Sequence, residues 1–124
     1  MPKESFLKNR WKSVGFALRG AFLLIRTEAS IKVQVFIAII MTAAGFFFEI
    51  SSTEWILQIL TIAGIMGAEG LNTAIEKVCD FIQPEFDNKI GFIKDVSAGA
   101  VMLVSIAATI IGFIIYLPKI FLMF

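Results

Sequence analysis

The chain of 124 residues has no histidine, a single cysteine and only three prolines. Without histidine there is neither an imidazole general base nor His-ligated zinc, which leaves carboxylates, lysine and asparagine for chemistry. The lone Cys79 cannot form an intrachain disulfide. Neither a GxxxxGK[ST] run nor a GxGxxG run is present, so a P-loop or Rossmann fold is unsupported. Any nucleotide would therefore be bound by another arrangement.

Charged residues are also scarce, at 17% of the chain, whereas hydrophobic residues make up 58%. The mean hydropathy of +0.86 is far above that of a soluble domain. A net charge of +1 gives no reason to expect nucleic acid as a partner. Lys and Arg recur through the first 26 residues and leave no room for a cleavable signal peptide. We therefore expect one all-α membrane domain, residues 1–124.

The segment 5–27 is predicted to be an amphipathic surface helix, preceded by a short polar tail at 1–4. Apolar residues such as Trp11, Leu18 and Phe22 recur at helical spacing, with Lys and Arg between them. A basic helix with aromatic anchors is typical of the membrane interface, where its cations meet anionic headgroups. The alternative is packing on a soluble core, for which this chain has no material.

Three later segments are long and apolar enough to cross a bilayer, and we predict transmembrane helices at 31–48, 55–82 and 92–118. Near the start of the first span, Lys32 and Gln34 are expected to snorkel to the interface. Tyr116 and Lys119 are expected to anchor the third span at the opposite interface.

The distribution of Lys and Arg predicts the orientation of these spans. Ten of the eleven lie in the N-terminal segment, at the start of the first span, or around the loop 83–94. Only Lys119 lies on the other side of the membrane. By the positive-inside rule, the N-terminus is cytoplasmic and the C-terminus is outside the inner membrane.

The second span carries a polar stripe at its predicted cytoplasmic end. Glu69, Asn72, Glu76 and Asp80 fall within a face about 80° wide at about 100° per residue. Ionised groups at bilayer depth are costly, so we expect this face to hold something positive, most simply a metal ion. The alternative is that these acids only pair with basic residues at the membrane surface.

The predicted topology brings Glu28, Lys94 and Asp95 to the same interface. Hard oxygen ligands without histidine or thiolate suit Mg²⁺, and cations can hold phosphates. Together these groups suggest phosphoryl transfer from a magnesium nucleotide to a hydroxyl that arrives from the bilayer. The rival function is a non-enzymatic proton or cation pathway through an oligomer. Such a pathway needs polar groups along the whole span, whereas here they cluster at one end.

The motif Glu69-Gly-Leu-Asn-Thr-Ala-Ile-Glu76-x-x-x-Asp80, followed by Lys94-Asp95-x-x-Ala98-Gly-Ala-Val, resembles the small integral-membrane kinases of prokaryotes, diacylglycerol kinase and undecaprenol kinase. The resemblance covers nearly the whole chain. It implies a homotrimer with composite sites, in which Mg²⁺ and ATP serve to phosphorylate a lipid alcohol. The implied product is phosphatidic acid from diacylglycerol, or alternatively undecaprenyl phosphate from undecaprenol.

The resemblance also implies roles for single residues. Glu69 would be the general base and Asn72 would orient the catalytic groups, while Glu28 and Glu76 would hold the metal. The implied ATP-binding residues are Lys12, Phe16, Glu28, Glu76, Glu85, Asp87, Lys94 and Asp95; the implied substrate-binding residues are Glu69, Gly70, Ser97 and Ala98.

Two of these positions depart from the family pattern. Phe16 stands where a tyrosine is common, and Asp87 stands where a histidine is frequent. Both changes affect contacts at the periphery of the nucleotide. Asn72-Thr73 and Glu54-Trp55 look closer to the undecaprenol kinase branch.

Overall fold

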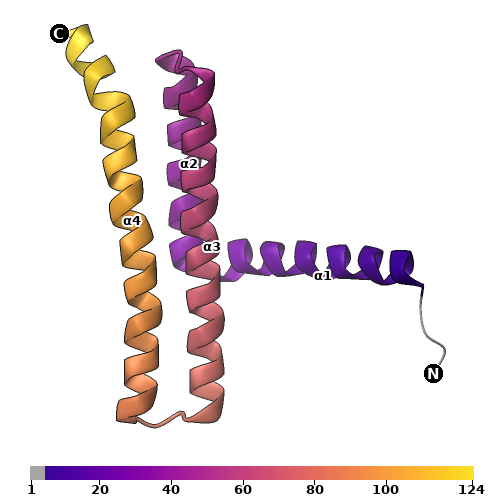
Figure 1. Ribbon diagram of the computed structural model, residues 1–124. Helices are drawn as coiled ribbons and strands as arrows, with labels where there is room; N and C mark the ends of the chain where they lie inside the picture. Colours follow the sequence, from indigo (N-terminus) through magenta and orange to yellow (C-terminus); the bar gives the residue numbers. More distant parts are fainter. Residues whose placement is uncertain (1–4) are drawn as a thin grey trace.

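The computed structural model describes residues 5–124 and is helical almost throughout (Figure 1). The predicted polar tail at 1–4 lies outside the described residues. The helices are α1 (Phe6–Thr27), α2 (Ala29–Phe47), α3 (Ser52–Ile82) and α4 (Asn88–Met123). Helices α2, α3 and α4 are long and apolar enough to cross a membrane. The predicted all-α membrane architecture is therefore confirmed.

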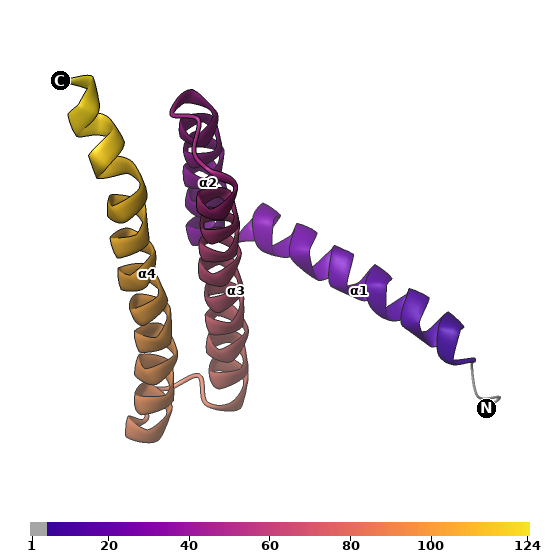
Figure 2. The same ribbon diagram turned by 45° about the horizontal axis from the view of Figure 1, so that its top comes forward.

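Helices α2, α3 and α4 form an antiparallel bundle, and α1 runs crosswise to it (Figures 1 and 2). The short loop 48–51 joins α2 to α3, and the loop 83–87 joins α3 to α4. We call the two ends of the bundle the 48–51 end and the 83–87 end. The α3–α4 hairpin continues well past the level of α1 at its 83–87 end (Figure 1). If α1 lies in the membrane interface, this end of the hairpin stands in water.

The helix starts are set by side-chain caps. At the start of α3, the Ser51 side chain accepts a hydrogen bond from the Glu54 backbone, and the Glu54 side chain accepts one from the Ser51 backbone. At the start of α4, the Asp87 carboxylate accepts from the backbone of Lys89 and Ile90. These caps satisfy backbone donors that would otherwise lack partners. Both helices therefore begin three or four residues before the predicted starts at 55 and 92.

The end of α4 also differs from the prediction. We expected the third span to stop at Pro118, but α4 continues through this proline to Met123. Proline removes one intrahelical hydrogen bond, a loss that membrane helices tolerate when neighbouring groups satisfy the freed carbonyl groups. Close to this position, the Lys119 ammonium donates a hydrogen bond to the Ile115 carbonyl at 3.0 Å.

The 48–51 end holds the best-packed part of the molecule. Ile50, Ile115 and Tyr116 are buried there, and Trp55 packs against them. The Tyr116 hydroxyl donates to Gln58 Oε1 at 2.5 Å, and Gln58 Nε2 donates to the Met41 carbonyl at 3.0 Å. We call this chain of hydrogen bonds the Gln58–Tyr116 bridge. Tyr116 thus points into the bundle and ties all three spans together, so its predicted role as an interfacial anchor is wrong.

Most of the remaining apolar surface is uncovered. Only 6–17% of the residues in the apolar windows of the three spans are buried within the chain. Large side chains such as Phe36, Ile39, Leu60 and Leu103 are mostly exposed. A soluble monomer rarely exposes apolar area on this scale. The surface therefore fits a lipid environment and supports the assignment as a membrane protein.

Candidate functional site

The polar face of α3 runs from the level of α1 toward the 83–87 end. Glu69 and Asn72 are half-buried at the upper part of this face, whereas Glu76 and Asp80 are exposed further down. One helix thus carries a half-buried carboxylate at the level of α1 and two exposed carboxylates in the projecting hairpin. Glu69 and Asp80 each contact a residue of another helix, whereas Asn72 and Glu76 contact each other.

The half-buried Glu69 is contacted by the neighbouring span α2. Gln34 Nε2 donates a hydrogen bond to Glu69 Oε1 at 3.2 Å. Gln34 therefore points across to α3, and the expectation that it snorkels to the interface is wrong. The polar contact offsets part of the cost of keeping Glu69 at this depth.

Asn72 lies one turn further along α3. Its Nδ2 group donates to Glu76 Oε1 at 3.1 Å, the usual reach of an i,i+4 pair on a helix. The other end of this amide, Asn72 Oδ1, is buried and has no hydrogen-bond partner among the described residues. A buried oxygen of this kind is ready to accept a hydrogen bond or to coordinate a cation.

Asp80 is paired with Lys94 across the loop 83–87. The Lys94 ammonium lies 2.5 Å from Asp80 Oδ1, with 38% of the lysine and 61% of the aspartate side chain exposed. At this exposure, solvent screens the ion pair, and it contributes little to stability. The pair therefore mainly orients Lys94, and it leaves the neighbouring Asp95 exposed.

Glu28 lies at the corner between α1 and α2. It is the C-cap of α1 and the N-cap of α2, with an extended backbone, and its side chain makes no capping hydrogen bond. The last turn of α1 lies against α3, because a Cβ atom at Gly70 would come within 3.0 Å of the Leu24 side chain. Among the described residues, the Glu28 carboxylate thus caps neither helix, and it lies near the level of Glu69.

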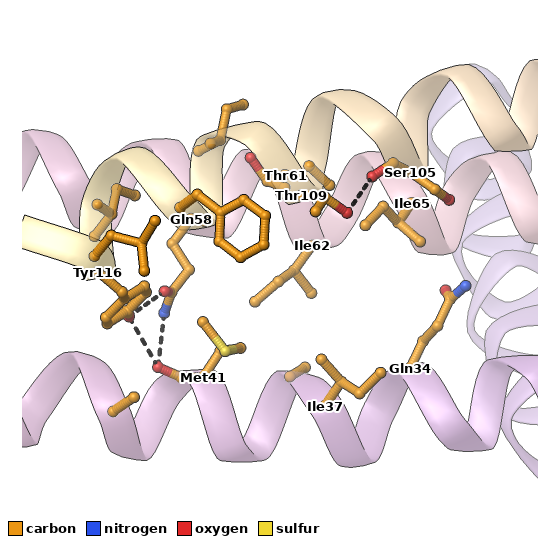
Figure 3. A pocket seen from close by; sticks show the side chains of 18 of the residues that line it. Gln34, Ile37, Met41, Gln58, Thr61, Ile62, Ile65, Ser105, Thr109 and Tyr116 are labelled. Carbon is orange, nitrogen blue, oxygen red and sulfur yellow. Dashed lines mark hydrogen bonds between the residues drawn. The ribbon is translucent and has the colours of Figure 1, made fainter. Parts of the chain in front are cut away.

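An apolar groove of about 590 Å³ runs between α2, α3 and α4 (Figure 3). On α2 it extends from Gln34 to Phe48, about 21 Å along the helix axis. Its lining is mostly Ile, Met, Ala and Thr side chains, and the Gln58–Tyr116 bridge crosses it toward the 48–51 end. At the other end, Gln34 borders the groove and also contacts Glu69. The groove therefore leads to the half-buried carboxylate.

Several predicted nucleotide-binding residues lie away from Glu69. Lys12 and Phe16 belong to the part of α1 that extends away from the bundle (Figure 1). Lys12 precedes Glu28 by 16 residues, about 24 Å along a helix axis. Asp87 caps α4, and Glu85 is exposed in the loop 83–87. A single copy of the chain therefore does not gather these residues around Glu69.

The predicted substrate-binding residues differ in accessibility. Ser97 is buried in α4, whereas the adjacent Ala98 is exposed. Gly70 forms the close contact with Leu24 described above. The structure thus assigns Gly70 a packing role, and its predicted contact with substrate stays a prediction.

The donors near α3 suit a magnesium nucleotide better than a metal held by protein alone. Within residues 5–124, no group of three acidic or thiol side chains is close enough to enclose a cation. Mg²⁺ in kinases commonly uses one or two carboxylates, with phosphate oxygens and waters as its other ligands. Glu28, Glu76 and the unpaired Asn72 Oδ1 provide that kind of oxygen set.

Sequence reasoning missed Gln34 and the Gln58–Tyr116 bridge. The available signal was a polar side chain inside an otherwise apolar run, which is costly in a membrane and usually faces a partner. Gln34 and Gln58 both fit that description. Their partners, Glu69 and the Met41 carbonyl, lie on other helices, so the sequence did not identify them.

Comparisons with known proteins agree with this architecture. Residues 15–116 match the family model described as prokaryotic diacylglycerol kinase. The chain is 36% identical to the undecaprenol kinase of Bacillus subtilis (strain 168), with 91% of this chain and 92% of the relative covered. It is 30% identical to the diacylglycerol kinase of Haemophilus influenzae, with 92% and 94% covered. A third relative, the diacylglycerol kinase of Synechocystis, is 29% identical, with 94% and 71% covered. The chain thus belongs to the prokaryotic diacylglycerol kinase family and is a membrane lipid kinase.

Proposed function

We propose that the chain transfers the γ-phosphoryl group of Mg-ATP to the terminal hydroxyl of a polyprenol such as undecaprenol. The observation that carries this proposal is the apolar groove that leads to Glu69 past Gln34. A groove about 21 Å long with a mostly apolar lining suits an extended apolar chain with its alcohol at the Glu69 end. The relative named undecaprenol kinase, which matches almost end to end, supports the same substrate.

In the proposed reaction, the lipid hydroxyl oxygen attacks the γ-phosphorus. Its proton passes to the Glu69 carboxylate, and the bond from the γ-phosphorus to the bridging oxygen breaks, so that ADP leaves with the electron pair. Positioning and charge neutralisation supply most of the rate in this class of reaction. Asn72 would hold Glu76 in place through the hydrogen bond between their side chains.

Glu28 and Glu76 are the proposed metal-binding carboxylates, since neither is consumed by a helix cap and Glu76 is exposed. The chemistry that Mg²⁺ supplies when bound is neutralisation of charge on the transferred phosphate. Lys94 and Asp95 are proposed to contact the nucleotide from the start of α4, and Glu85 from the adjoining loop. Asp87 would contact the nucleotide through its Oδ2 atom, because Oδ1 accepts the hydrogen bonds that cap α4.

The complete site is proposed to be shared between neighbouring copies in a homotrimer. Helix α1, which carries Lys12 and Phe16, extends away from the bundle (Figure 1), so these two residues would serve the site of a neighbouring copy. Open space over Gly67 and Gly99 supports close contact between helices of different copies, because small residues let membrane helices approach.

The test is phosphate transfer in lipid–detergent micelles with Mg-ATP, offering a polyprenol and a diacylglycerol separately. We expect phosphorylated polyprenol from the wild type. Glu69→Gln should lower kcat about 10²–10⁴-fold, as expected when a general base is removed. Its KM for ATP should stay within about twofold, because Glu69 is not a proposed metal ligand. Transfer by Glu69→Gln at the wild-type rate would remove Glu69 from this role.

Diacylglycerol is the second candidate, favoured by two relatives that carry the name diacylglycerol kinase. It too presents one primary alcohol, but with two acyl chains beside it. A higher kcat/KM for diacylglycerol than for polyprenol in the same micelles would select this substrate.

A further inference from the structure

Within the described part of the chain, Gln34 is the side chain of a neighbouring helix that hydrogen-bonds the proposed base. Its Nε2 donates to Glu69 Oε1 at 3.2 Å, across the contact between α2 and α3. A carboxylate on a long flexible side chain can otherwise adopt several rotamers. The hydrogen bond fixes one oxygen of Glu69 and leaves Oε2 to receive the proton of a substrate hydroxyl.

The location of Gln34 connects this contact with the lipid. Gln34 borders the apolar groove at the end opposite the Gln58–Tyr116 bridge (Figure 3). Among the polar side chains of the groove, Gln34 lies directly beside Glu69. A lipid hydroxyl would stop here, because it needs a hydrogen-bond partner and the side chains of Gln58, Thr61, Thr109 and Tyr116 are already hydrogen-bonded within the chain.

The same amide has an unsatisfied oxygen. Gln34 Oε1 is buried and has no hydrogen-bond partner among the described residues. Buried polar atoms normally have a partner, so an orphan acceptor beside a reactive carboxylate calls for an explanation. An incoming hydroxyl is a donor of the right kind, and it can bond to Gln34 Oε1 before it turns to Glu69.

We propose that Gln34 is a positioning residue for phosphoryl transfer, which orients the Glu69 carboxylate and receives the lipid hydroxyl at the end of the groove. This inference rests on the proposed role of Glu69 as the base. It requires no particular lipid, because polyprenol and diacylglycerol both present one alcohol. A purely structural role, as a polar link between α2 and α3, is the alternative to be separated by experiment.

The experiment is a double-mutant cycle of Gln34→Leu and Glu69→Gln, measured as kcat on whichever alcohol the wild type phosphorylates. Leucine nearly preserves the volume but removes both hydrogen-bonding groups. We expect Gln34→Leu alone to lower kcat about tenfold, the size of one hydrogen bond to a charged group, with KM for ATP unchanged. In the Glu69→Gln background, the same substitution should lower kcat by a clearly smaller factor than in the wild type, because the effect through the Glu69 carboxylate is gone and only the contact with the lipid hydroxyl remains.

The matched control is Thr42→Val, which lies on the same helix as Gln34 but outside the groove lining, and whose hydroxyl donates to the Ala38 carbonyl of its own helix. This variant should retain the wild-type kcat. Equal losses from Gln34→Leu in both backgrounds, or a wild-type kcat in Gln34→Leu, would overturn the proposal. Wild-type turnover on each lipid, measured first, reports on the proposed substrate separately. A mistaken substrate therefore leaves the cycle interpretable on the other lipid.

Discussion

At the scale of single residues, polar side chains in this chain act in pairs that cross helix boundaries. Gln34 with Glu69 and Asp80 with Lys94 each join two helices by one contact. Only the acidic members of these pairs were identified from sequence as a functional stripe. Their spacing on α3 follows from helix geometry, whereas a partner on another helix depends on rotation of the two helices about their axes, which periodicity does not determine.

Glu76 is predicted to act on the metal rather than on the proton. In Glu76→Gln, the amide keeps the size of the side chain but loses its negative charge, so affinity for the cation should fall. We expect the Mg²⁺ concentration for half-maximal activity to rise about tenfold or more. The measurement is a Mg²⁺ titration of kinase activity at fixed ATP. The control is Glu49→Gln, at the opposite end of the bundle; an unchanged midpoint in Glu76→Gln would refute the metal assignment.

At the scale of helices, the starts and ends are governed by a few local groups. The motif Ser51-x-x-Glu54 is a capping box that could have been read from sequence, and it accounts for the early start of α3. Asp87 acts similarly for α4. The third span was predicted to end at Pro118 because the uncharged run stops before Lys119, but α4 continues past this charge and through the proline to Met123.

The hairpin of α2 and α3 depends on a glycine. A Cβ atom at Gly45 would lie 2.6 Å from Cη2 of Trp55 and 3.1 Å from Cδ1 of Ile50. Because Trp55 also packs in the cluster with Tyr116, its ring has little room to yield. Gly45→Ala should therefore destabilise the fold by about 1–3 kcal/mol, as overpacked cores do.

The measurement is the thermal midpoint in detergent, followed by loss of helical signal. Gly112→Ala is the matched control, because a Cβ atom there meets open space. Gly112→Ala should leave the thermal midpoint of unfolding unchanged. Equal midpoints for Gly45→Ala and the wild type would show that Trp55 can move aside.

At the scale of the whole molecule, the class, the number of spans and the family motif could be predicted from sequence. Composition and run length are sufficient for that, because a bilayer imposes both. The groove and its closure by Gln58 and Tyr116 could not be predicted, since they require three helices to be placed together. Lys12 and Phe16 of α1 were likewise assigned to the nucleotide site only through the family resemblance.

The orientation in the membrane is a prediction for the whole chain. With Cys79→Ser as background, a single cysteine at Asn88 should react with an impermeant thiol reagent only from the cytoplasmic side of inverted vesicles. A cysteine at Ser52 should react only from the outside of intact cells, because the loop 48–51 carries no Lys or Arg. The reverse pattern of labelling would invert the topology.

The Gln58–Tyr116 bridge has a consequence for how a lipid enters. It joins all three spans near one membrane face, whereas near the other face α2 contacts α3 through the Gln34–Glu69 hydrogen bond and is packed at Ile31. Motion of α2 relative to α3 and α4 should therefore be smallest at the 48–51 end and larger at the Gln34 end. The gap would open widest where the alcohol of a lipid travels in the plane of the headgroups. A long lipid could then enter the groove laterally from the bilayer, with its alcohol end leading and its apolar chain still in the membrane.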